Sequence, residues 1–108
     1  ATASVKYERL YPPTINSTAE ALFMMRVAEG LVGSSQLVRD LDPSMGSEDF
    51  SFMLQVKPGA YMRIGQGTEN GPGSCALHNN RYDFNDAILP LGGAMHASLA
   101  EQFMPLSE

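Results

Sequence analysis

The side chain in this sequence best suited to chemistry is that of His78, which follows a glycine-rich stretch and precedes an aromatic and acidic segment. An imidazole is a good zinc ligand, and a histidine on a loop can point into a cleft. No second ligand lies at the spacing of a metal motif, since H-E-x-x-H, C-x-x-C and H-x-D are all absent. Asp83 and Asp86 do not complete a site with it. Spacing alone therefore favours a solvent-exposed, hydrogen-bonding histidine rather than a metal ligand.

The adjacent acids Glu48 and Asp49 form the second candidate, at the expected start of a helix. Negative charge in the first turn is stabilised by the helix dipole, and that interpretation is sufficient for both side chains. Cys75 stands three residues before His78, but a Cys–His nucleophile pair also needs a third group to orient the histidine. His96 falls in the expected last helix, where a surface histidine is the simpler interpretation. None of these residues specifies a reaction by itself.

The elements that must position these residues are expected to alternate between strands and helices. Alternating or uniformly apolar stretches predict strands at residues 2–10, 36–39 and 60–65. Capping residues and helical apolar spacing predict helices at residues 18–32, from Ser47 to Lys57, and from a cap at Asn85 or Asp86 to about Met104. Such alternation is typical of an α/β fold around a mostly parallel sheet. The few strands indicate only a part of a larger sheet.

Two segments between the expected elements are rich in proline or glycine, and their composition predicts how stiff each is. Tyr11-Pro12-Pro13 predicts a stiff extended connector, because two prolines fix two φ angles and remove two hydrogen-bond donors. Four glycines from Gly65 to Gly73 predict a flexible loop. Its G-x-G is no dinucleotide fingerprint, since no helix follows closely.

The composition indicates a globular, acidic chain of about one domain. The 108 residues are 44% apolar and 18% charged with a net charge of −5, so disorder is not expected. The seven basic residues are scattered, which argues against nucleic acids and anionic membranes as partners. No apolar run approaches the roughly 18 residues of a bilayer span. The single cysteine forms no internal disulfide, and we expect a cytoplasmic protein.

Three segments together resemble the C-terminal part of the zinc-type amidohydrolases, a family that includes hippurate hydrolase and the N-acyl-amino-acid and auxin-conjugate hydrolases. They are Leu77–Asp86 (LHNNRYDFND), Met45–Phe50 (MGSEDF) and Tyr11–Asn16 (YPPTIN). The resemblance implies a partial three-layer α/β sheet with flanking helices, from a zinc-peptidase-like catalytic domain, preceded by one strand of a lid domain. By this resemblance, residues 1–11 would be the last strand of the lid (dimerisation) domain, 12–17 the hinge and 18–108 the C-terminal part of the catalytic domain.

The same resemblance implies roles for particular residues. His78 would be the last ligand of a two-metal centre, because the family's final histidine precedes a segment like Tyr82-Asp83-Phe84. Gly46, Glu48 and Asp49 would shape the substrate pocket. The family's general base comes from an upstream Glu-Glu pair, which is absent here, so no catalytic residue is expected in this chain.

The expected function is therefore that of a parent enzyme. It would be a metal-dependent amidohydrolase, with zinc or manganese, that cleaves N-acyl amino acids or related small amides and works as a homo-oligomer. This chain alone would be inactive and would bind no metal tightly, because stable sites need three or four protein ligands. The alternative is a non-enzymatic, self-associating α/β module with an interaction or structural role. The metal content of the whole gene product distinguishes the two.

Overall fold

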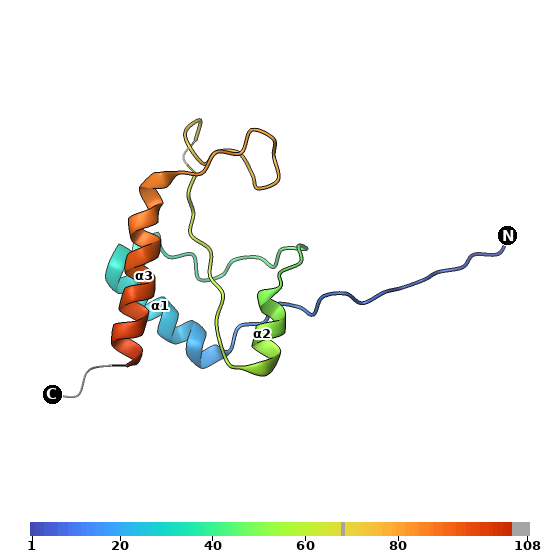
Figure 1. Ribbon diagram of the computed structural model, residues 1–108, viewed down its shortest axis with the longest axis horizontal. Coiled ribbons are helices and arrows are strands. Elements are labelled where there is room, and N and C mark those ends of the chain that lie inside the picture. The colour runs from blue at the N-terminus through green and yellow to red at the C-terminus, as the bar shows by residue number, and fades with distance from the viewer. Residues whose placement is uncertain (68, 105–108) are drawn as a thin grey trace. The chain divides into compact units, whose positions relative to one another are not determined.

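The computed structural model describes residues 1–67 and 69–104, and over those residues all regular secondary structure is helical (Figure 1). The three α-helices are α1 (Thr18–Val32), α2 (Phe50–Val56) and α3 (Leu89–Phe103). Two short 3-10 helices, η1 (Ser34–Gln36) and η2 (Asp86–Ile88), complete the regular structure. Thr68, within the predicted glycine loop, and residues 105–108, at the end of the predicted catalytic range, lie outside the described residues.

The predicted α/β fold is wrong, because none of the described residues forms a strand or a sheet. Residues 2–10 are all exposed, and in Figure 1 they run as a plain extended trace. Their alternation predicted one buried face, yet Val5 is 88% and Tyr7 is 80% exposed. A strand needs a neighbour to take its amides and carbonyls, and sequence alternation does not report whether that neighbour is present. The predicted strands at 36–39 and 60–65 are wrong as well.

The helix predictions succeed because their signals are local. The first helix occupies Thr18–Val32, as predicted, and the carbonyl of Ser17 accepts the Ala21 amide at 2.9 Å. Asn85 caps the last helical segment, since its side chain accepts the Ala87 amide at 3.2 Å. The middle helix begins three residues later than the predicted cap at Ser47, at Phe50. There the Glu48 side chain, two residues before Phe50, accepts the Phe50 amide.

The first of two compact units comprises Ala1–Phe23 and Val38–Tyr61. The side-chain amide of Asn16 bonds both backbone groups of Tyr61, donating to the carbonyl at 2.9 Å and accepting from the amide at 2.8 Å. Ser17 makes a similar pair with Gly59: its amide donates to the Gly59 carbonyl at 2.9 Å, and its hydroxyl accepts the Gly59 amide at 3.1 Å. Four hydrogen bonds thus join the segment before α1 to the segment after α2 without any strand.

The second unit comprises Met24–Leu37 and Met62–Glu108. Val27 of α1 is 1% exposed and Met95 of α3 is 2% exposed, and they are the only buried apolar residues among those described. Ile64 lies close to α3, since a Cβ added at Gly92 would come within 3.9 Å of its Cδ1. Along α3, Met95 is thus buried, whereas Phe103 at the last residue of the helix is 73% exposed. No described helix is long and apolar enough to cross a membrane.

Candidate functional site

His78 lies in a loop of the second unit, between the glycine-rich turns and η2. Its φ of 68° is in the left-handed region, which few non-glycine residues adopt, although histidine adopts it more readily than most. The residue is exposed, and its neighbours close small turns around it. The Asn79 amide donates to the Ala76 carbonyl at 3.2 Å, and the Tyr82 amide donates to the Asn79 carbonyl at 3.0 Å. The Asn79 side chain accepts the Arg81 amide at 2.9 Å.

The imidazole itself takes no part in these turns. Among the hydrogen bonds found within the described part of this loop, none uses a His78 ring nitrogen. Strained backbone in a fixed loop is common where a side chain must be held in one direction for function. His78 therefore presents an accessible imidazole on a backbone whose conformation is set by the loop.

Gln66 holds the C-terminal end of this loop. Its Nε2 donates to the Tyr82 hydroxyl at 2.9 Å, and its Oε1 accepts the Asn85 amide at 3.3 Å. Its backbone carbonyl accepts Asn85 Nδ2 at 2.9 Å. All three bonds connect residues 16 or 19 positions apart in the sequence. The bonds are part-buried, so water competes with them only partially.

The N-terminal end of the loop is held at Gly73, whose amide donates to the Asp83 carbonyl at 3.2 Å. The backbone of Gly73 also passes very close to that of residues 66 and 67. A Cβ added at Gly73 would lie 2.5 Å from the Gln66 carbonyl oxygen, and one added at Gly67 would lie 2.6 Å from the Gly73 carbonyl oxygen. Gly73 also has a φ of 76°, so this crossing requires glycine for both space and conformation.

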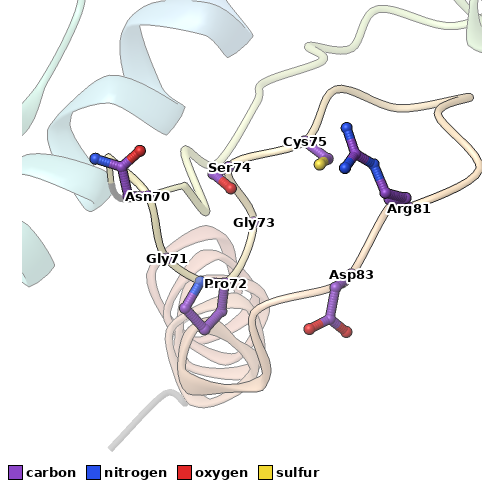
Figure 2. Close-up of a pocket in the computed structure, with 8 residues that line it drawn as sticks. All are labelled: Asn70, Gly71, Pro72, Gly73, Ser74, Cys75, Arg81 and Asp83. Atoms are coloured by element: carbon purple, nitrogen blue, oxygen red, sulfur yellow. The ribbon is translucent and has the colours of Figure 1, made fainter.

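A pocket of about 350 Å³ lies between the glycine turns and the returning chain (Figure 2). Its lining residues are Asn70, Gly71, Pro72, Gly73, Ser74, Cys75, Arg81 and Asp83. In Figure 2 the Arg81 side chain extends towards Cys75, whereas the Asp83 carboxylate points away from the guanidinium. His78 does not line this pocket. The pocket and the histidine are therefore separate features of the same loop.

The described residues of this chain bring no complete set of metal-binding side chains together. Within residues 1–67 and 69–104, no three His, Cys, Asp or Glu side chains come close enough to hold an ion. Asp83 and Asp86 do not form such a group with His78 in the described structure. A single exposed imidazole fits one place in a site whose other ligands come from elsewhere, since neutral imidazole is a common metal ligand.

Gly46, Glu48 and Asp49 belong to the first unit, so the predicted pocket residues and His78 lie in different units. Glu48 Oε1 accepts the Phe50 amide at 3.2 Å, which satisfies an amide in the first turn of α2. This backbone bond, followed by side-chain bonds from Tyr61 and Asp49, lowers the pKa of Glu48 below its ordinary value of 4.5. Asp49 occupies the cap position but its side chain accepts no amide of the helix, and Gly46 has open space around it.

The Glu48 region is further fixed by its neighbours. The Ser51 hydroxyl donates to the Glu48 carbonyl at 2.6 Å, and Ser51 is the one buried polar residue of the described chain. The Phe50 and Tyr61 rings lie 5.7 Å apart, and the Tyr11 and Phe52 rings lie 5.4 Å apart. These contacts are within the range of favourable aromatic pairs. These contacts give the acids a structural role, but both acids precede α2, so the prediction that they lie in its first turn is wrong.

Gln66 is the residue that the sequence did not single out. It stands between two glycines in a stretch that reads as a strand running into a loop, and no motif includes it. A polar side chain inside a glycine-rich turn region, followed by a tyrosine and an asparagine that need partners, is the only sequence signal available. Such a signal does not identify which of several polar residues makes the bond.

Comparison with known proteins gives consistent matches. The profile of peptidase family M20/M25/M40 matches residues 2–102. The chain is 36% identical over 93 residues to IAA-amino acid hydrolase ILR1-like 2 of Arabidopsis thaliana, covering 86% of the chain and 21% of that protein. It is 34% identical over 106 residues to thermostable carboxypeptidase 1 of Saccharolobus solfataricus, covering 95% of the chain and 25% of that protein.

A third relative is hippurate hydrolase of Campylobacter jejuni, 33% identical over 93 residues, covering 86% of the chain and 23% of that protein. No solved structure gives a significant match. The chain therefore spans about a fifth to a quarter of the length of these curated relatives.

Proposed function

The chain belongs to peptidase family M20/M25/M40, a family of hydrolases, and from this premise we propose that it supplies one metal ligand, His78, to a metal-dependent amidohydrolase. The proposed substrates are N-acyl amino acids or related small amides. The observation that carries the proposal is the family match over residues 2–102 together with an accessible imidazole on a constrained loop. The names of the relatives, which include amino-acid conjugate and hippurate hydrolases, support the substrate class.

The role of this chain would be to hold the His78 imidazole in place. Metal ligation requires a neutral imidazole with one nitrogen free, and His78 is exposed and outside the bonds of its own loop. The bound cation, zinc or manganese, would supply Lewis acidity to the scissile carbonyl and to water. The general base and the remaining ligands would come from other parts of the whole protein, because the described residues contain no cluster of three ligands.

Gly46, Glu48 and Asp49 are proposed to contribute to the wall of the substrate pocket. Glu48 is held by the Phe50 amide, so its carboxylate direction is fixed from within α2. Gly46 leaves open space, which a side chain would narrow. These properties suit residues that shape a pocket without reacting.

Residues 1–11 are proposed to belong to a lid domain and residues 12–17 to the hinge that follows it. The lid segment exposes Val5, Tyr7 and Leu10 at 88%, 80% and 72%. Apolar side chains exposed to this degree in one short segment favour burial against another surface. We therefore propose a homo-oligomer in which this segment is covered. A monodisperse monomer by light scattering, at high concentration of the whole protein, would contradict it.

The test uses the whole protein encoded by the reading frame that contains this chain, called the full-length protein below. We expect it to contain bound zinc or manganese by elemental analysis and to hydrolyse hippurate or another N-acyl amino acid. His78→Ala should lower activity by more than about 100-fold, because the loss of even an outer partner of a ligand costs 10–100-fold. His96→Ala is the matched control, since His96 is an exposed histidine on α3. Full activity in His78→Ala would refute the ligand assignment.

The 108-residue chain alone is proposed to be inactive and to bind zinc only weakly. One imidazole without partners gives no stable site. Isothermal calorimetry with zinc should show no stoichiometric tight binding. A tight site that disappears in His78→Ala would show that the chain contains further ligands.

The alternative function is a non-enzymatic module that works through self-association or partner binding. It is favoured only if the full-length protein also lacks upstream metal ligands. In that case elemental analysis would find no metal and hydrolysis would be absent, while light scattering would still find an oligomer.

A further inference from the structure

Gln66 makes contacts that the proposed chemistry does not use directly. It is half-buried, and it bonds the Tyr82 hydroxyl, the Asn85 amide and the Asn85 side chain. Tyr82 is the last residue of the loop that carries His78, and Asn85 lies three residues after it. Asn85 in turn caps η2 through the Ala87 amide, so Gln66 connects the loop to the helical segment η2–α3.

The loop is closed at its base from both directions. Gly73 and Asp83 are joined by a backbone bond of 3.2 Å, and Gly73 also lies against the Gln66 backbone. Residues 74–82 therefore leave and return at one place, which is built around Gln66. A short loop with both ends fixed samples few conformations, because the closure entropy is already lost.

The left-handed backbone conformation of His78 is a second reason to ask what holds this loop in place. Non-glycine residues with positive φ persist only where the surroundings over-determine them. The turn bonds of Asn79 set the conformation locally, but they do not orient the loop relative to η2 and α3. The bonds of Gln66 reach both the loop, at Tyr82, and the cap of η2, at Asn85.

We propose that Gln66 is a positioning residue, which orients the His78 loop through Tyr82 and Asn85 so that the imidazole meets the metal. This inference rests on the proposed role of His78 as a ligand. Residues that contact a metal ligand rather than the metal strongly affect metal affinity, since the ligand must be held within about 0.5 Å of the position in which it binds the metal. Gln66 touches neither substrate nor metal in this account.

The test compares Gln66→Ala and Gln66→Glu in the full-length protein. Gln66→Ala removes both side-chain bonds. Gln66→Glu can retain both, because the Tyr82 hydroxyl can donate to one carboxylate oxygen while the other accepts the Asn85 amide. Gln55→Ala is the matched control, since Gln55 is an exposed glutamine on α2.

Two readouts are measured for each variant. The first is hydrogen exchange at the Tyr82 and Asn85 amides, with Val27 and Met95 amides as the internal reference for global stability. The second is metal affinity by competition with a chelating dye. We expect Gln66→Ala to speed exchange at Tyr82 and Asn85 only, and to weaken metal affinity about 10–100-fold. Gln66→Glu should resemble the unsubstituted protein in both readouts, and Gln55→Ala should change neither.

The outcomes separate the two proposals. Unchanged exchange at Tyr82 and Asn85 in Gln66→Ala would refute the positioning role directly. Faster exchange with unchanged metal affinity would refute it as well, because the loop would then loosen without consequence for the metal. A full-length protein that binds no metal in any form would instead refute the proposed function, while the exchange data would still report whether Gln66 fixes the loop.

Discussion

Two junctions in this chain use a side-chain amide to join distant segments, and they differ in what the amide meets. Asn16 bonds the amide and the carbonyl of a single residue, Tyr61. Gln66 bonds a tyrosine hydroxyl and the backbone amide of a different residue. The Asn16 junction resembles the backbone pairing of a strand, because both of its hydrogen bonds go to the Tyr61 backbone and neither involves the Tyr61 side chain. The Gln66 junction depends on Tyr82 and Asn85 by identity.

This difference separates a framework contact from a specific one. Backbone pairing such as that of Asn16 stabilises a chain path, whatever the function of the region. A contact that needs three particular side chains around a strained histidine is more selective.

Gly73→Ala should cause the largest loss of stability, about 2–4 kcal/mol in the free energy of unfolding. The added Cβ would lie 2.5 Å from the Gln66 carbonyl, and φ is 76°. Chemical denaturation followed by circular dichroism measures the change. Gly93→Ala is the control, because it lies in α3 with nothing within 4 Å, and alanine there should stabilise by about 0.5–1 kcal/mol. Equal effects of the two substitutions would mean that the crossing at Gly73 is not tight.

Asn16→Ala should cost about 1–2 kcal/mol, because it removes two hydrogen bonds that are exposed and so compete with water. Asn16→Asp should not restore them fully, since its second oxygen would face the Tyr61 carbonyl where an N–H donor stood. Hydrogen exchange at the Tyr61 amide measures the junction itself. Slow exchange in Asn16→Ala would show that another contact protects this amide and that the junction is redundant.

Tyr82→Phe should cost about 1 kcal/mol, the usual net value of one hydrogen bond. The substitution removes only the hydroxyl that accepts from Gln66 and keeps the ring. Tyr7→Phe is the matched control, because Tyr7 is 80% exposed. If the Gln66 junction depends on side-chain identity, Tyr82→Phe should also speed exchange at the Asn85 amide. An unaffected Asn85 amide would make the two bonds of Gln66 independent of each other.

Features of this fold that depend on local contacts could be predicted from the sequence, whereas features that depend on distant contacts could not. The bounds of α1 and the cap at Asn85 were predictable, because capping and helical spacing involve residues a few positions apart. The strands were wrong, because pairing depends on a distant partner and residues 2–10 have none among the described residues. At Tyr61 a side chain takes the place of a neighbouring strand. The Tyr61 amide donates to the Asn16 side chain, whereas in a sheet it would donate to a backbone carbonyl.

The candidate site likewise has one feature that the sequence predicted and others that it did not. His78 was found through its resemblance to a family motif, and the family match confirms the resemblance, although its role as a ligand stays a prediction. The left-handed φ of His78 and the contacts of Gln66 were not predictable. Both depend on which residues the folded loop brings together, across separations of 16 and 19 positions.

The smallest expected effect belongs to Glu48, and its pH dependence tests whether the first unit is fixed by charge. The Phe50 amide holds the pKa of Glu48 below 4.5 in the folded chain, so the folded state favours the carboxylate. The resulting stabilisation is complete above the unfolded pKa and is lost as the pH falls through the lower folded value. Glu48→Gln should therefore be slightly less stable at about pH 7, and the difference should shrink towards about pH 3.

Because Glu48 is near the surface, salt and water weaken this effect, and a matched charge control is needed. Glu101→Gln removes the same charge from an exposed position on α3. Denaturation midpoints are compared for the two variants across the acid range. A deficit in Glu48→Gln that exceeds that of Glu101→Gln at neutral pH and vanishes in acid supports a carboxylate held by the Phe50 amide. A deficit that is constant with pH would mean that the charge of Glu48 does not strengthen the hydrogen bond from the Phe50 amide, which a glutamine side chain can also accept.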